Sequence, residues 1–207
     1  MRQRASGVWG IALASLIMLA APQPAFAGLQ IDLVFIDNAP PPPPSLLVGG
    51  GKLAEIMRVA ADAWEHVFQN DFQRRAGKWK VTIEYGWAPL GGQYAKEMLL
   101  TQGGHPVRIT RALVLFNNSP PPPIDEGIAG FFADPTPWDN SEYLRYTTDL
   151  ARLETGWLNI GRVFSGATGD AAERIDLLTI ATHEIGHALG LDLGYVGFSD
   201  QYRPPFV

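Results

Sequence analysis

The segment from Asp170 to Gly190 constrains the fold of this 207-residue chain most strongly. Its apolar residues recur at helical spacing, and His183 and His187 stand four residues apart between them. Asp170, with Glu173 three positions later, is typical of a capped helix start, and a glycine is typical of a helix end. We therefore predict a helix that packs one face into a core and turns its histidines towards a cleft. The residues expected in that core are Leu178, Ala181, Ile185 and Leu189.

Residues four apart on a helix lie one above the other, so His183 and His187 can direct two ring nitrogens at one metal ion. Zinc binds such nitrogens at about 2.0–2.1 Å. Glu184 lies beside the pair but off their line, a position that suits a general base acting on a metal-activated water. The alternative interpretation is two surface histidines on a solvated helix face. The chain has two other histidines. His66 is expected on the polar face of an earlier helix, and His105 is expected in a loop.

Apolar patterning predicts several further elements upstream of this helix. The expected strands are 29–35, 78–87, 107–116 and 157–164. The expected helices are 52–72, with Gly77 as the stop signal that follows it, and 141–153. This order predicts an α/β fold of the α+β kind, with a twisted, mostly parallel sheet and two main helices. The last helix is expected to lie under the sheet and to carry the histidine pair.

Two proline runs, Pro40–Pro44 and Pro120–Pro123, follow the ends of expected strands. Such runs adopt stiff polyproline II and cannot enter the interior of a sheet. We interpret both as rigid surface loops, with a recognition motif for a partner as the alternative.

Residues 1–27 have the features of a secretory signal peptide. Arg2 and Arg4 give a positive start, an apolar stretch follows, and Ala25-Phe26-Ala27 matches a signal-peptidase site. The apolar stretch is short for a membrane span, although an uncleaved N-terminal anchor is the alternative. We expect cleavage after Ala27, a secreted or periplasmic location, and a mature domain at 28–207.

Composition excludes several classes of function. The formal net charge is −5, and it becomes −7 once Arg2 and Arg4 are removed, which argues against binding to nucleic acid or to anionic lipid. No cysteine is present, so disulfides, thiolate zinc ligands and cysteine nucleophiles are excluded. No later segment reaches the roughly 20 apolar residues of a spanning helix, so an integral membrane protein is not expected.

Residues 180–191, IATHEIGHALGL, resemble the zinc-binding helix of the metzincin clan, which includes matrix metalloproteinases and their bacterial relatives. The element order over 29–190 is also similar to the zincin-like N-terminal subdomain of that clan. The resemblance implies a zinc metalloendopeptidase that hydrolyses protein or peptide substrates lying along an edge strand. It makes His183 and His187 zinc ligands, Glu184 the general base, and Gly190 the turn that returns the chain towards the metal.

The sequence departs from the clan after Gly190. The clan places a third ligand three residues after the glycine, where this chain has Leu193, which cannot bind zinc. Carboxylate oxygens are acceptable zinc ligands, so Asp192 is our first candidate for the third ligand and Asp200 the second. The clan's methionine-containing turn is missing, and 17 residues follow Gly190 in this sequence, so we expect its C-terminal subdomain to be short or missing.

These departures leave two other functions open. The first is a non-catalytic or truncated metzincin-fold envelope protein that acts as a binding module. The second is a zinc hydrolase of non-peptide substrates with the same metal ligands. The leading interpretation is an exported zinc endopeptidase in which Glu184 acts as general base and Tyr195 is the candidate oxyanion donor.

Overall fold

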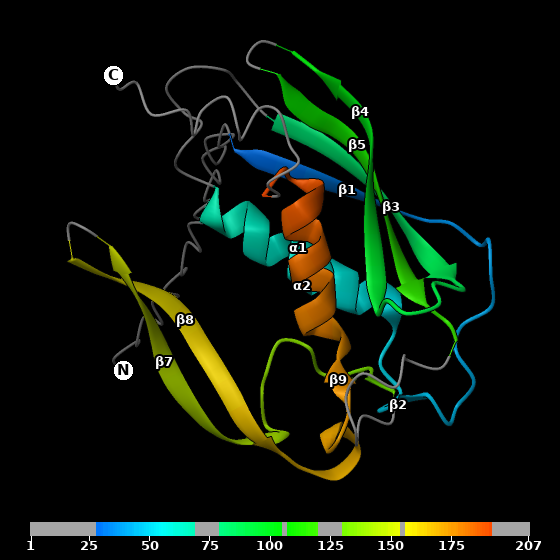
Figure 1. Cartoon of the computed structure of the whole chain (residues 1–207), viewed down its shortest axis with the longest axis vertical. Helices are drawn as coiled ribbons and strands as arrows, with labels where there is room; N and C mark the ends of the chain where they lie inside the picture. Colours follow the sequence, from blue (N-terminus) through cyan, green and yellow to red (C-terminus); the bar gives the residue numbers. More distant parts are fainter. Residues whose placement is uncertain (1–27, 69–78, 105–106, 120–129, 154–155, 192–207) are drawn as a thin grey trace, which may run out of the picture.

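The computed structural model describes residues 28–68, 79–104, 107–119, 130–153 and 156–191 (Figure 1). Two helices and nine strands occur in this part of the chain. In chain order they are β1 (Leu29–Phe35), β2 (Leu47–Val48), α1 (Leu53–Val67), β3 (Trp79–Ala88), β4 (Ala95–Gly103), β5 (Arg108–Asn117), β6 (Phe131–Phe132), β7 (Tyr143–Leu153), β8 (Gly156–Ala167), β9 (Ile175–Asp176) and α2 (Leu177–Ala188), with a short 3₁₀ turn at Gly169–Ala171. The signal peptide, Gly77, His105 and the run Pro120–Pro123 lie outside the described residues.

The main sheet has the strand order β1-β3-β5-β4. Strands β1, β3 and β5 are parallel to one another, and β4 runs antiparallel to β5. The strands predicted at 29–35, 78–87 and 107–116 are confirmed as β1, β3 and β5. Several of their alternating apolar residues, among them Ile31, Val81 and Val114, are fully or almost fully buried, whereas Phe35 at the end of β1 is exposed. The mixed, mostly parallel α/β class with two helices is therefore confirmed.

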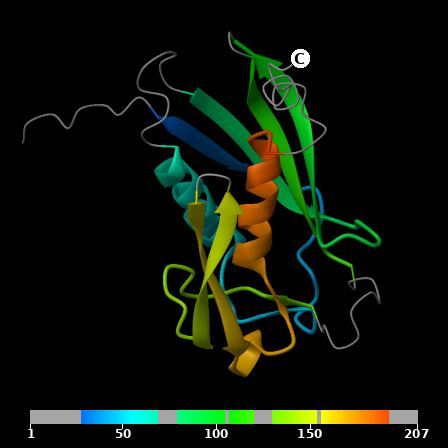
Figure 2. The same cartoon turned by 60° about the vertical axis from the view of Figure 1, so that its left-hand side comes forward.

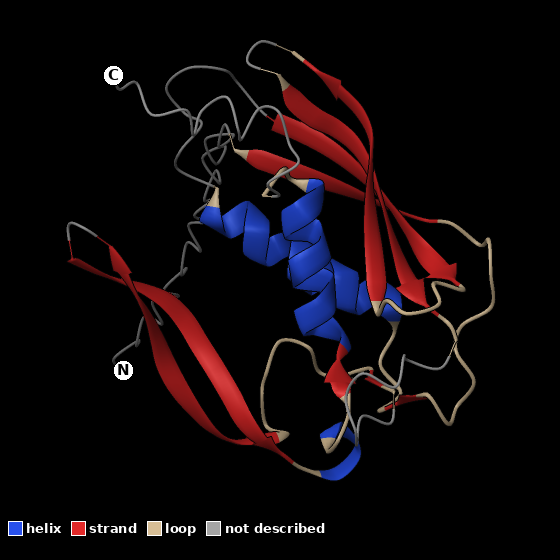
Figure 3. Cartoon of the chain, in the orientation of Figure 1, coloured by secondary structure: helices blue, strands red, loops and turns tan. Residues whose placement is uncertain are grey.

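Both helices lie on the same side of this sheet, as Figures 1 and 3 show. Helix α1 buries Ile56, Met57, Ala60 and Ala61 against it. Helix α1 is shorter than the expected 52–72. It ends at Val67, with Phe68 as its C-cap. Helix α2 contacts α1, β4 and β5, so the helix with the histidine pair does lie under the sheet.

Strand β4 was not predicted from the sequence. Its residues are mostly half-buried or exposed, and its register with β5 shifts at Thr101. Edge strands of this kind lack the apolar alternation that identifies a strand with one buried face. Among the described strands, β4 forms one edge of the main sheet, and it lies in contact with α2.

The helix expected at 141–153 is wrong, because this segment forms β7. It pairs antiparallel with β8, the strand that was predicted at 157–164. The apolar spacing of the segment fits a helix, but Thr147 and Thr148 are β-branched and favour a strand once a partner strand is present. The β7–β8 hairpin lies on the side of α2 away from β4 (Figures 1 and 2).

The start of the last helix also differs from the expectation. Asp170 belongs to the 3₁₀ turn, and Glu173 has a φ of 57°, which a right-handed helix cannot contain. Residues Ile175–Asp176 instead form β9 beside β6, in a small parallel sheet of order β2-β6-β9. Helix α2 begins only after this pairing, at Leu177. The predicted capping box of Asp170 and Glu173 is therefore wrong.

The first proline run lies in a loop between β1 and β2, outside any strand, as predicted for a surface loop. The Asn118 side chain donates a hydrogen bond to the carbonyl of Pro40, which links this loop to the end of β5. None of the described helices has the length and apolar character needed to cross a membrane.

Candidate metal centre on helix α2

Hydrogen bonds fix both ends of α2. At its start, the carboxylate of Asp176 accepts hydrogen bonds from the backbone N–H groups of Leu178 and Thr179 and from the Thr179 hydroxyl. At its end, Gly190 takes a φ of 93°, and its N–H donates to the carbonyl of His187. The N–H of Leu191 donates to the carbonyl of Gly186, and these two bonds together form a Schellman turn. The glycine stop predicted at Gly190 is confirmed.

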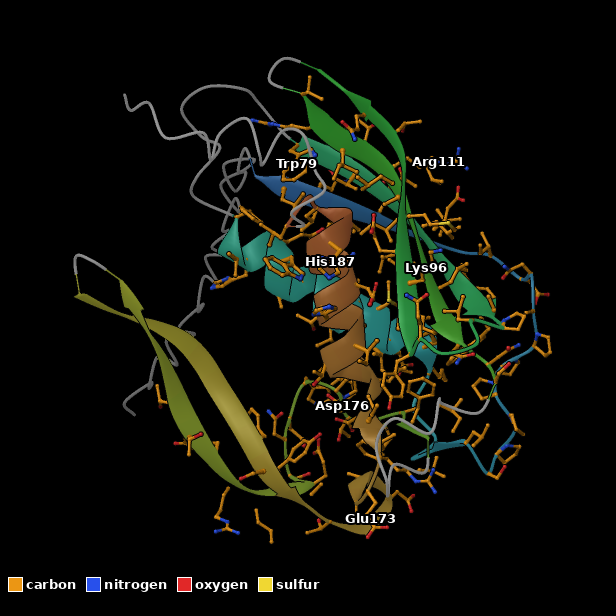
Figure 4. All side chains as sticks on the ribbon, viewed as in Figure 1. Trp79, Lys96, Arg111, Glu173, Asp176 and His187 are labelled. Carbon is orange, nitrogen blue, oxygen red and sulfur yellow. The ribbon has the colours of Figure 1, made fainter. Side chains whose placement is uncertain are left out.

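His183 and His187 meet as their spacing predicts. Their Nε2 atoms are 2.9 Å apart, and their rings are almost perpendicular, with centroids 4.4 Å apart. His183 is exposed, whereas His187 is half-buried. Partial burial and the nearby His187 lower the pKa of His183, which favours the neutral imidazole that can donate a lone pair to a metal. Figure 4 shows His187 and Asp176 towards opposite ends of the same helix.

The turn after α2 orients the ring of His187. Its Nδ1 lies 3.1 Å from the carbonyl oxygen of Leu191. A carbonyl oxygen only accepts hydrogen bonds, so Nδ1 carries the hydrogen, and the Nε2 of a neutral His187 is an acceptor. This Nε2 lies within hydrogen-bond distance of the Nε2 of His183. A backbone acceptor on the distal nitrogen is the usual support for a metal-binding histidine, and here the Schellman turn supplies it.

Glu184 is buried, with an exposed fraction of only 8%. It lies among the buried residues of α2, near β4, where the backbone N–H of Glu97 donates a hydrogen bond to its carboxylate. Burial raises the pKa of Glu184, although nearby His187 and the Glu97 N–H oppose this effect. A carboxylate with a raised pKa is a better proton acceptor at neutral pH than an ordinary surface glutamate.

The core face of α2 is close to the predicted one. Ala181, Ile185 and Leu189 are buried, and Leu177 and Ala188 join them. Leu178, expected among these residues, is only half-buried and faces a cleft instead. The helix starts later than predicted, but its helical phase is unchanged, so most of the core stripe was assigned correctly.

Trp64 of α1 packs directly against the motif. Its indole Nε1 donates a 2.9 Å hydrogen bond to the carbonyl of Thr182, the residue before His183. A Cβ at Gly186 would lie 2.9 Å from the Trp64 ring, closer than real Cβ contacts. The glycine of the motif therefore allows the indole to reach the backbone of α2. This contact sets the rotation of α2 and with it the direction of the histidines.

A cleft of about 620 Å³ opens beside His183. Side chains from both helices and from the β7–β8 hairpin form its walls. The described residues that line it are Trp64, Asn140, Tyr143, Phe164, Asp176, Leu178, Thr179, Thr182 and His183. Sequence reasoning missed the aromatic residues of this cleft, because Tyr143 was assigned to a helix and Phe164 to the end of an isolated strand. The cross-strand contact of Tyr146 with Phe164 became visible only with the hairpin.

The other predicted metal ligands are not brought to the pair within the described chain. Asp192 and Asp200 lie outside the described residues. His66 is exposed on α1, on the polar face where the sequence places it. Among the described residues, no group of three or more His, Asp or Glu side chains is arranged to hold a metal ion. The described site thus comprises two imidazoles and one adjacent carboxylate.

No protein-family model, no curated protein and no solved structure matches this chain. The chemistry of the site is therefore inferred from its own side chains.

Proposed function

We propose that this protein is an exported zinc-dependent endopeptidase, with His183 and His187 as zinc ligands and Glu184 as general base. The observation that carries the proposal is the 2.9 Å approach of the two Nε2 atoms on a helix whose next carboxylate is buried beside them. The resemblance of residues 180–191 to the metzincin zinc helix leads to the same chemistry.

The two imidazoles fit zinc. Two zinc–nitrogen bonds of about 2.0–2.1 Å at a tetrahedral angle place the nitrogens about 3.3–3.4 Å apart. The observed 2.9 Å separation needs only a small ring rotation to reach this value. Neutral imidazole is a preferred zinc ligand, and the Nδ1 hydrogen bond of His187 already presents the correct nitrogen. Asp192 remains our proposed third ligand, ahead of Asp200.

Glu184 has the surroundings that a general base needs. When bound, zinc supplies Lewis acidity that lowers the pKa of a water molecule and polarises a substrate carbonyl. The raised pKa of Glu184 suits it to take a proton from that water and to return it to the leaving amine. The hydrogen bond from the Glu97 N–H holds the carboxylate between α2 and β4, so the proton is moved at a fixed position.

The position of β4 suits an extended substrate. Within the described sheet, β4 pairs with β5 along one side only, and it lies beside the helix that carries Glu184. Peptides commonly bind to a free strand edge through their backbone groups. A peptide added to β4 would bring its carbonyl groups close to Glu184, which agrees with the edge-strand binding that the metzincin resemblance implies.

Zinc content and hydrolysis together test this proposal. We expect purified protein to hold one zinc ion per chain by metal analysis, and to lose casein hydrolysis on chelation and regain it on addition of zinc. Glu184→Gln should lower kcat at least about 100-fold and keep the metal, because the amide cannot accept a proton. His183→Ala should lose the metal as well.

Two results would contradict the proposal. One is the absence of stoichiometric zinc in the intact protein. The other is a Glu184→Gln variant with unchanged hydrolysis. Asp62→Asn is a matched control, because Asp62 is an exposed carboxylate on α1 and pairs with Arg58. Zinc-free protein that still folds would instead favour the non-catalytic binding module.

A further inference from the structure

The cleft beside His183 has three aromatic walls from three different elements. Trp64 comes from α1, Tyr143 from β7 and Phe164 from β8, while Leu178 of α2 forms a fourth apolar surface. The rings of Tyr143 and Phe164 are 5.6 Å apart between centroids, so the hairpin presents one joined aromatic surface. His183 borders the same cleft. A ligand in it therefore lies next to the proposed metal ligand.

The size of the cleft suits a side chain with some attached backbone. Its volume of about 620 Å³ falls within the range of about 300–1,000 Å³ that is typical of small-ligand pockets. The polar groups at its border are the Asn140 amide and the hydroxyls of Thr179 and Thr182. These groups can hydrogen-bond to the polar end of a long side chain whose stem lies on the aromatic rings.

The charges around the cleft are acidic. Asp176 lines it, and Glu142 adjoins Tyr143 in the chain. Burial raises the pKa of Glu142, and the carboxylates of Asp134, Asp176 and Asp139 raise it further. Burial also raises the pKa of Tyr143, and three of these carboxylates add to the effect. Several negative groups thus act on one wall of the cleft, where an approaching positive charge would be stabilised.

We propose that this cleft binds the side chain of an arginine or lysine of the peptide substrate, and this inference rests on the proposed endopeptidase function. Aromatic faces attract cations, and a guanidinium group also stacks on them as a planar surface. Asp176 lies at the start of α2, where it lines the cleft, and its carboxylate attracts the same positive charge. The aliphatic stem covers Leu178 and the rings, so both the apolar walls and the acidic border are matched by one residue type.

A large apolar side chain is the competing occupant, and charge separates the two. An apolar group would contact the aromatic walls equally well. The Asp176 carboxylate at the border already accepts hydrogen bonds from the start of α2, but a carboxylate also attracts a cation, and an apolar side chain supplies none. A basic side chain supplies that positive charge, so the cleft selects arginine or lysine over leucine or phenylalanine.

The test compares arginine with citrulline, which has the same shape without the charge. Fluorogenic peptides with a serine and alanine background carry arginine, citrulline or leucine at each of several positions in turn. We expect one position at which the zinc-loaded protein cleaves the arginine peptide about tenfold better in kcat/KM than the citrulline peptide. Equal cleavage of both at every position, or a preference for leucine, would overturn the proposal and leave the peptidase function intact.

A charge variant locates the preference in the cleft. Asp176→Asn should reduce the arginine-to-citrulline ratio several-fold, because asparagine caps a helix as well as aspartate does but carries no charge. Glu55→Gln removes the same charge from the first turn of α1 and should leave the ratio unchanged. A ratio that is unaffected by Asp176→Asn would contradict the assignment of the cleft.

Binding measurements separate this inference from the function on which it rests. Titration calorimetry of full-length Glu184→Gln protein, with the same two peptides, requires no hydrolysis. Tighter binding of the arginine peptide, in the absence of any hydrolysis by wild-type protein, would support the cleft and reject the peptidase. Equal binding of the two peptides would reject the cleft.

Discussion

The two helices are held in place by different means. Helix α1 begins after Lys52 without a side-chain cap, and it is anchored by a continuous stripe of buried residues. Helix α2 has a carboxylate cap at its start and a Schellman turn at its end. Helix α2 also buries six of its 12 residues, against four of 15 in α1. The comparison indicates that hydrogen bonds fix both ends of α2 in addition to its packing against the core.

The largest effect is expected from the packing of α1. Ile56 is completely buried, so Ile56→Ala leaves a cavity and should lower the free energy of unfolding by about 2–5 kcal/mol. Urea unfolding followed by circular dichroism measures the change. Val67→Ala on the same helix removes an exposed side chain and should cost less than about 0.5 kcal/mol. Similar losses in both variants would show that α1 is not anchored by its stripe.

The turn after α2 is the next most sensitive feature. Gly190 has a positive φ, which costs a residue with a Cβ about 1–2 kcal/mol, so Gly190→Ala should destabilise the protein by that amount. It should also weaken zinc binding about tenfold, because the Leu191 carbonyl that orients His187 would move. Competition with a chelating dye measures this affinity. Gly190→Asn is the control, since asparagine tolerates this conformation better than alanine. A Gly190→Ala variant with wild-type zinc affinity would show that the turn does not position the proposed zinc ligands.

The contact between the two helices gives a smaller effect. Gly186→Ala gains about 1 kcal/mol of helix propensity but forces its Cβ against Trp64, and overpacking costs about 1–3 kcal/mol. We expect a net loss of about 1 kcal/mol in thermal or urea unfolding. In a Trp64→Phe background the smaller ring leaves room for the methyl group, so the same change should become neutral or stabilising. Additive losses in this double-mutant cycle would contradict direct packing.

The smallest effects compare the two helix starts. Asp176→Ala removes a cap that accepts two backbone hydrogen bonds and should cost about 1 kcal/mol. Lys52→Ala at the start of α1 removes no cap and should stay within about 0.5 kcal/mol of wild type. Parallel urea titrations measure both. Equal losses at the two positions would mean that α2 does not depend on its cap more than α1 does.

Sequence patterns predicted the parts of the fold whose side chains alternate between core and solvent. Strand β1 was predicted with its observed bounds, because apolar residues recur at every second position. The helix predicted at 52–72 occupies Leu53–Val67, and Ile56, Met57 and Ala60 of its apolar stripe are buried whereas Val67 is exposed. Strand β4 was missed because it lies at an edge with little burial. Strand β7 was mistaken for a helix because its own apolar spacing fits a helix, whereas its hairpin pairing with β8 decides its structure.

The candidate site divides in the same way. His183, Glu184 and His187 were found from their spacing, since a helix converts that spacing into proximity. Trp64 and the hairpin residues of the cleft were not found, because they come from elements far away in the sequence. The cap at Asp176 had a local signal, an aspartate followed three residues later by a threonine before an apolar run. The stronger match at Asp170 obscured it, and the pairing of β9 with β6 decided between the two.

The contact of Trp64 with Gly186 has a consequence for protein engineering. In His-Glu-x-x-His the chemistry specifies three positions and leaves two open, yet in this chain Ile185 fills the core and Gly186 accommodates an indole ring. A transplant of the five residues onto another scaffold would therefore carry the donors without their alignment. The recipient needs a neighbouring helix with a tryptophan at the crossing point, or an equivalent wedge, before the two rings converge.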